Sequence, residues 1–199
     1  LTKSPKPLIM RRHIFILLLF CALAASAQSH LEFNGIPIDG PVSVFTEKMK
    51  AAGYRVHPSS KKMPAGMRYF INPDKSNFDY LEYCSVCVRY DVRTKTVFCV
   101  SQVYEFKNTI GGLATSRRLF DETKARMSAA YPDSDSCGSG VMESVDGLPF
   151  YGVDVNNADC EFIGTISCRI DCDFSLLPDR ILLFIEYSDV LNSRKYFRP

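Results

Sequence analysis

The sequence predicts an α+β fold, with an antiparallel sheet (or sheets) built from hairpins and two main helices packed on one face. The first observation is the segment 83–106, in which apolar and polar residues alternate along two stretches joined by a polar turn. The second is a pair of segments, one on either side of this hairpin, whose apolar residues recur at spacings of three and four. The third is the order of the elements, because a helix followed by antiparallel strands occurs twice along the chain.

The hairpin 83–106 is the stretch around which we expect the domain to be organised. Successive side chains of a strand point to opposite faces, so one face of this ribbon is apolar and the other is mostly polar. The apolar face is predicted to hold Cys84, Val86, Val88, Tyr90, Phe98, Val100 and Tyr104, and the other face Ser85, Cys87, Arg89, Asp91, Cys99, Ser101 and Val103. The apolar face needs a cover, which helices before and after the hairpin can supply.

The first helix is predicted to begin at Asp39-Gly40-Pro41, because proline suits the first helical position, and to end at Gly53. Its apolar stripe consists of Val42, Phe45, Met49 and Ala52. The stripe is about one helix face wide, so we expect the helix to lie on a sheet.

The second helix is predicted to start after a break at Gly111-Gly112, with Thr115 or Ser116 as its cap, and to stop at Pro132. Its apolar stripe consists of Phe120, Thr123, Met127 and Tyr131. The basic residues of this helix alternate with acids, which is typical of a solvated face with local ion pairs: Arg117, Arg118, Lys124 and Arg126.

Further strands are predicted from short apolar runs that end at turn residues. We expect them at 31–38, 54–57, 67–71, 149–155, 161–174 and 180–187. The segment 133–147 is rich in Ser, Gly and Asp and is predicted to be a loop. Aromatic side chains are expected to fill the core, among them Tyr104, Phe106, Tyr131, Phe150 and Tyr151.

Residues 1–27 have the pattern of upstream residues followed by a cleavable secretory signal. Met10 precedes two arginines, an apolar run at 14–24 and Ala25-Ser26-Ala27, whose small residues suit a signal peptidase. The apolar run is shorter than the roughly 20 residues that a membrane-spanning helix needs. We therefore expect cleavage after Ala27, export to the periplasm, the cell exterior or the outer-membrane surface, and no transmembrane anchor afterwards. Residues 28–199 would form one α+β domain, with 28–110 and 111–199 as candidate halves.

Charge argues against a nucleic-acid partner. The leader carries four basic residues and no acid, so its removal changes the formal net charge from +2 to −2. A nearly neutral protein has no overall positive field that would hold a polyanion.

Seven cysteines follow the leader, and an oxidising compartment would allow them to form disulfides worth roughly 2–4 kcal/mol each. The candidates are Cys84, Cys87, Cys99, Cys137, Cys160, Cys168 and Cys172. Their pairing cannot be read from the sequence, and because seven is odd at least one thiol stays free or bonds another chain.

No catalytic, metal or cofactor site is predicted. The pair Cys84 and Cys87 forms a C-x-x-C within a strand, so the two sulfurs should point to opposite faces, which disfavours both a redox couple and a zinc site. The segment 133–138 begins like a calcium loop, but an EF-hand needs oxygen ligands where Cys137 stands and a glutamate where Ser144 stands. After the leader only two histidines remain, and neither a G-x-S-x-G elbow nor a glycine-rich phosphate loop occurs.

Three short pieces carry a resemblance to a group of exported proteins. FNGIPIDG at 33–40 stands directly before a helix, Tyr131-Pro132 ends the second helix, and EYSDVLN at 186–192 lies near the C-terminus. In these pieces the chain resembles small exported proteins of Bacteroidota-type bacteria, in which a signal peptide is followed by F-x-G-I-P-I-D-G. The resemblance implies the compartment and the fold class, and it implies no assigned activity and no catalytic residue. The cysteines are not part of it.

We therefore expect an exported module that is not an enzyme and that binds a protein, a peptide or an envelope component through its sheet face or edge. The surface expected to meet the partner surrounds Arg89, Cys99 and Ser101 on the outer face of the hairpin. A periplasmic thiol or disulfide redox protein is the first alternative, because of the seven cysteines. An inhibitor of a secreted enzyme is the second. The sequence does not predict the oligomeric state.

Overall fold

The computed structural model describes residues 30–72, 78–131, 141–143, 149–157, 161–171 and 179–196, and it confirms an α+β chain with an antiparallel sheet. The leader lies outside these residues. The elements are β1 (Glu32–Phe33), β2 (Ile36–Pro37), α2 (Val42–Ala51), β3 (Arg55–Val56), η1 (Pro58–Lys62), β4 (Met67–Ile71), β5 (Leu81–Tyr90), β6 (Val97–Lys107), α3 (Ile110–Ala130), β7 (Val141–Glu143), β8 (Phe150–Asn156), β9 (Phe162–Asp171), β10 (Arg180–Asp189) and α4 (Val190–Tyr196).

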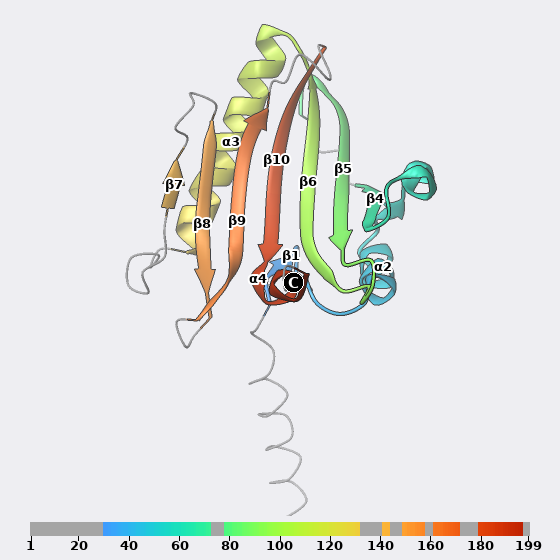
Figure 1. Ribbon diagram of the computed structural model, residues 1–199. Coiled ribbons are helices and arrows are strands. Elements are labelled where there is room, and N and C mark those ends of the chain that lie inside the picture. The colour runs from blue at the N-terminus through green and yellow to red at the C-terminus, as the bar shows by residue number, and fades with distance from the viewer. Residues whose placement is uncertain are drawn as a thin grey trace, which may run out of the picture.

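The described strands form one large antiparallel sheet in the order β3-β4-β5-β6-β10-β9-β8-β7, and β1 and β2 form a separate small hairpin (Figure 1). The predicted hairpin 83–106 is confirmed as β5 and β6. The last strand, β10, lies in the middle of the sheet between β6 and β9. Residues from before and after position 110 therefore meet along the pair β6 and β10, where Ser101 stands opposite Glu186.

The inner face of the large sheet carries the core. Val86, Val88 and Val100 of the hairpin are fully buried there, together with Leu183 of β10. Helix α3 packs across β6, β8, β9 and β10 (Figure 1). Helix α2 contributes three residues of its predicted stripe to the same apolar cluster: Val42, Phe45 and Met49.

Helix α3 begins earlier than the sequence predicts. Thr109 is its cap, and the hydroxyl oxygen of Thr109 accepts the backbone N–H of Gly112 at 3.1 Å. The predicted break at Gly111-Gly112 and the predicted cap at Thr115 or Ser116 are therefore wrong, and both of these polar residues are buried inside the helix. Glycine occurs at 112 because a Cβ there would overlap the backbone carbonyl oxygen of Lys107.

Three further predictions need correction. Residues 31–38 form the tight hairpin of β1 and β2 instead of one strand, because Asn34 and Gly35 both have positive φ and turn the chain. Pro41 occupies the N-cap position of α2, one residue before the helix begins, and not the first helical position. The predicted loop 133–147 contains β7, which adds an edge strand beside β8.

Helix α4 was not predicted, and it joins the two ends of the described chain. The side-chain amide of Asn192 in α4 donates to the carbonyl oxygen of Ile38 at 2.9 Å. Nearby, the ring of Phe33 meets the ring of Tyr187 edge-on, with 5.5 Å between the centroids. The segments 33–40 and 186–192, which carry the sequence resemblance, are thus in contact.

Of the helices in the described part of the chain, none combines the length and the apolar composition that crossing a membrane requires.

Candidate functional site

The three residues of the predicted partner surface lie together on the outer face of the sheet. The guanidinium of Arg89 donates from Nη2 to the Sγ atom of Cys99 at 2.8 Å and lies 2.8 Å from Oε2 of Glu186. The hydroxyl of Ser101 donates to the same carboxylate oxygen at 3.0 Å. The cross-strand register explains the cluster, because Arg89 stands opposite Cys99 and Ser101 opposite Glu186.

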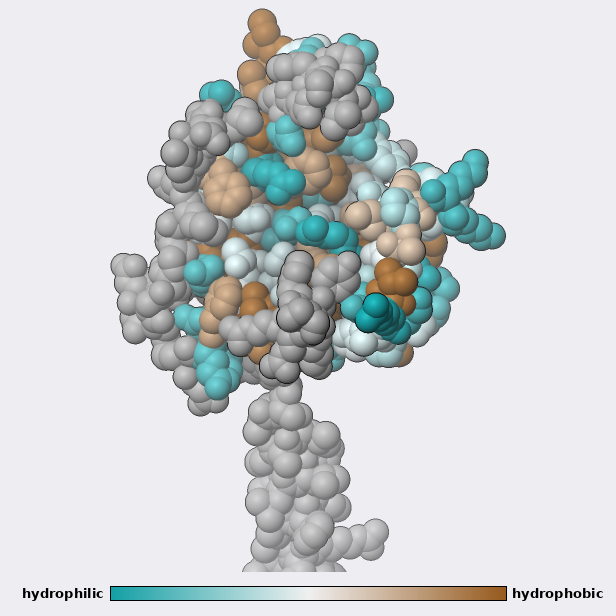
Figure 2. Space-filling view, in the orientation of Figure 1, coloured by the Kyte–Doolittle hydropathy of each residue, from teal (hydrophilic) through white to brown (hydrophobic). Residues whose placement is uncertain are grey.

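This outer cluster is a closed network. The guanidinium of Arg89 is neutralised by Glu186, and the thiol of Cys99 is almost fully buried beneath it. Burial raises the pKa of Cys99, the carboxylate of Glu186 raises it further, and Arg89 opposes the rise. Seen in the orientation of Figure 1, hydrophilic and hydrophobic residues are interspersed over the coloured part of the surface (Figure 2). A partner role for this face stays a prediction.

No disulfide joins the described cysteines to one another. Cys84 belongs to the core cluster of the inner face and receives hydrogen bonds from the side-chain amides of Asn72 and Gln102, whereas Cys87 stands opposite Ser101 on the outer face. Cys99 and Cys168 are buried thiols. The remaining disulfide candidates, Cys137, Cys160 and Cys172, lie outside the described residues.

Both histidines of the described chain have hydrogen-bond partners. His30 pairs with the buried Asp189 at 3.0 Å, and Nδ1 of His57 accepts the N–H of Ser59 at the start of η1. Among the described residues, no group of three or more His, Cys, Asp or Glu side chains could hold a metal ion. The segment 133–138, considered above as a calcium loop, lies outside the described residues.

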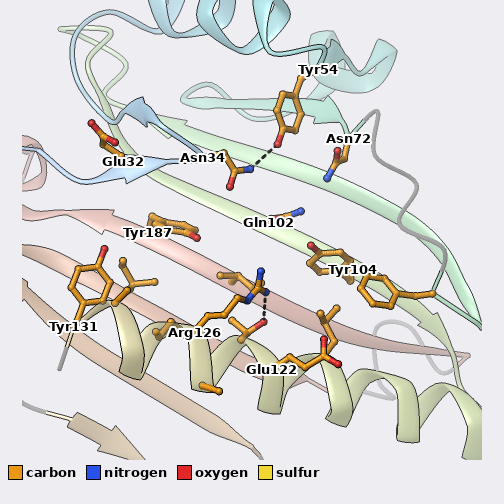
Figure 3. A pocket seen from close by; sticks show the side chains of 18 residues that line it. Glu32, Asn34, Tyr54, Asn72, Gln102, Tyr104, Glu122, Arg126, Tyr131 and Tyr187 are labelled. Atoms are coloured by element: carbon orange, nitrogen blue, oxygen red, sulfur yellow. Dashed lines mark hydrogen bonds between the residues drawn. The ribbon is translucent and has the colours of Figure 1, made fainter.

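A groove of about 880 Å³ opens over the inner face of the sheet, beside α3 (Figure 3). Its floor consists of strand residues whose side chains share that face: Gln102, Tyr104, Ile166, Ile185 and Tyr187. One wall comes from α3, where Leu119, Glu122, Thr123, Arg126 and Met127 recur at helical spacing. Asn34, Tyr54 and Asn72 lie across the groove from α3 (Figure 3), and Phe78 also lines the groove.

Arg126 brings a positive charge into this groove. Figure 3 shows its side chain extending from α3 toward the tyrosines of the sheet. Its only hydrogen bond within the described residues goes to the hydroxyl oxygen of Thr123, one helical turn earlier, at 3.1 Å. No carboxylate of the described chain forms an ion pair with it. Glu122, the nearest acidic residue along this helix face, pairs with Arg118 instead, with 3.9 Å between its Oε1 atom and Nε of Arg118.

The two tyrosines of the floor, Tyr104 and Tyr187, have neutral hydroxyl groups. Burial raises the pKa of Tyr104 and of Tyr187, and the positive charge of Arg126 opposes the rise in both. Neither hydroxyl forms a hydrogen bond within the described residues, although only 8% of Tyr104 is exposed. The groove therefore offers two phenol donors and a guanidinium, all of which could bind a ligand.

Sequence reasoning did not find this groove. It placed Tyr104 and Tyr131 in the core and Arg126 on a solvated helix face, and both readings describe part of what is seen. Arg126 does lie on the exposed side of α3, but that side borders the groove. The walls come from segments that are far apart in the chain, so no local pattern in the sequence indicates that they meet.

Comparison of this chain with protein-family models, with curated proteins and with solved structures found no match.

Proposed function

We propose that this chain is an exported binding module without catalytic activity, and that it holds its ligand in the groove between α3 and the inner face of the sheet. The observation that carries the proposal is the groove itself. Its volume of about 880 Å³ falls within the range of small-molecule sites, and the guanidinium of Arg126 and the hydroxyls of Tyr104 and Tyr187 belong to side chains that line it. The outer cluster of Arg89, Cys99 and Glu186 has its charges and hydrogen bonds satisfied within the chain, which favours the groove as the ligand site.

The thiol alternative receives less support from the geometry. A reactive cysteine needs an exposed thiolate whose pKa has been lowered. Burial raises the pKa of Cys87, of Cys99 and of Cys168 instead. Cys84 and Cys87 lie on opposite faces of β5, so they are not placed to form a couple with each other.

Binding in the groove is tested with a tryptophan pair on α3. Ala125 and Ala129 are both exposed, but only Ala125 borders the groove. We expect fragments found by ligand-detected NMR on the wild-type protein to lose binding in Ala125→Trp, because the new ring fills the groove, and to keep it in Ala129→Trp. Hits that bind both variants equally would place the site elsewhere and contradict the proposal.

Export is tested separately. The leader pattern predicts that a chain started at Met10 and expressed in a bacterium with two membranes leaves the cytoplasm and begins at Gln28 after cleavage. Intact-mass measurement of the periplasmic and external fractions checks this expectation. A chain found only in the cytoplasm with its leader retained would contradict export without bearing on the groove.

A further inference from the structure

The groove contains one cation that the described protein does not neutralise. Within the described residues Arg126, at an exposed position of α3, bonds only to the neutral hydroxyl of Thr123, whereas Arg89 of β5 is paired with Glu186 at 2.8 Å. A guanidinium is a donor that never loses its charge at ordinary pH, and planar carboxylates match its geometry. Among the described residues, no carboxylate forms an ion pair with this guanidinium, which can therefore bind an anionic group.

Two neutral donors stand beside this cation. The positive charge of Arg126 acts on Tyr104 and on Tyr187, and Figure 3 shows both tyrosines on the floor that its side chain approaches. Only 8% of Tyr104 is exposed, and its side chain lines the groove as that of Tyr187 does. A carboxylate has two oxygens, which can accept from the guanidinium of Arg126 and from these hydroxyls.

The remaining floor and the flanking acids restrict the ligand further. Ile166, Ile185 and Met127 offer an apolar surface next to these donors. Glu32 and Glu122 also border the groove. Their negative charges repel a ligand with several negative charges more strongly than a ligand with one. A single anionic group attached to an apolar body fits this combination better than a phosphate ester or a polyanion.

We propose that the groove binds a carboxylic acid with an apolar body, whose carboxylate lies between the guanidinium of Arg126 and the hydroxyls of Tyr104 and Tyr187. This inference rests on the proposed function, because it names the class of ligand for the same groove. The apolar body lies along Ile166 and Ile185, beside the donors.

Octanoate and octanamide are the probes that test the proposal, because they share one chain and differ in the charge of the head group. Calorimetric titration of the mature protein at neutral pH should show octanoate binding at least about tenfold more tightly than octanamide, since hydrogen bonds to charged groups are the strong ones. In Arg126→Met this preference should disappear while the octanamide affinity stays within about twofold. Tyr104→Phe and Tyr187→Phe should each reduce the preference about fivefold, because each removes one donor.

Arg117→Met is the matched control, since Arg117 is an exposed arginine of α3 that does not border the groove. This variant should bind octanoate and octanamide with the affinities of the wild type. Equal affinity of the wild type for octanoate and octanamide, a preference that survives in Arg126→Met, or binding of neither compound would overturn the ligand class. If both compounds bind equally and Ala125→Trp abolishes both, the groove still stands as the binding site. If Ala125→Trp leaves both affinities unchanged, the result contradicts the proposed function as well.

Discussion

The carboxylate of Asp189 accepts the backbone N–H of Leu31 at 3.1 Å, which joins two residues 158 positions apart. Asp189 is fully buried, and its second oxygen accepts the N–H of Asn192 at 2.9 Å in the first turn of α4. Asn192 in turn holds the carbonyl oxygen of Ile38. One buried carboxylate therefore organises the junction between the end of β10, helix α4 and the first described segment.

We expect Asp189→Ala to lower the free energy of unfolding by about 3 kcal/mol, because two buried N–H groups lose their acceptor. Asp189→Asn should lower it less, since one acceptor oxygen remains. Urea unfolding followed by circular dichroism measures the difference. Asp121→Ala, at an exposed position of α3, is the control and should change the value by less than about 0.5 kcal/mol. Equal losses of unfolding free energy in Asp189→Ala and Asp121→Ala would contradict the role assigned to Asp189.

The two glycines at the start of α3 should respond differently to alanine. A Cβ at Gly112 overlaps the backbone oxygen of Lys107, whereas a Cβ at Gly111 overlaps only the ring of Tyr80, which is half exposed and can move away. We expect Gly112→Ala to destabilise the protein by about 2 kcal/mol and Gly111→Ala to be nearly neutral, because alanine also favours the helix. Thermal unfolding of both variants checks this, and a neutral Gly112→Ala would show that the helix start can shift freely.

The buried thiols should react slowly in the folded protein. Burial raises the pKa of Cys87 and of Cys99, and it raises the pKa of Cys168 to about 12, so these sulfurs stay protonated near neutral pH. We expect iodoacetamide to modify them only after urea is added, as read by peptide mass spectrometry at each position. Rapid labelling of any of them in the native protein would favour the redox alternative instead.

The turn between β5 and β6 should make stability depend on pH. The backbone N–H groups of Thr94 and Arg93 donate to Asp91 Oδ1 at 2.7 Å each and hold the pKa of this carboxyl below its ordinary value. Such a group adds stability above the pKa of the unfolded chain, about 3.9, and this contribution is lost as the pH falls through the folded-state value. The urea midpoint of the wild type should therefore fall more between about pH 6 and pH 3 than that of Asp91→Asn, which keeps the acceptor oxygen. Parallel curves for the two proteins would contradict this account.

The sequence predicted the parts of the fold that depend on local patterns. Alternation along 83–106 correctly placed Val86 and Val88 on the core face and Cys87 and Arg89 on the opposite face, because the period of a strand is set by its backbone. The start of α3 was missed for a physical reason. Glycines normally interrupt a helix, but here Gly112 is required by the close approach of the backbone at Lys107, which no local pattern shows.

The groove could not be predicted in this way. Arg126, Tyr104 and Tyr187 come from α3, β6 and β10, and only the strand order, with β10 beside β6, brings them together. Strand order is set by packing across the whole chain. Each of these residues, taken alone, has the pattern of an ordinary core or surface position.

The central place of β10 has a consequence for how the chain can be completed. A polypeptide is synthesised from its N-terminus, so β6 and β9 both exist before the strand that separates them has been made. Until residues 180–189 emerge, each of these strands presents a bare row of amide and carbonyl groups to any neighbouring molecule. A nascent chain must therefore be kept apart from its neighbours until β10 has been made, and chains truncated ahead of Arg180 should aggregate and not persist as smaller domains.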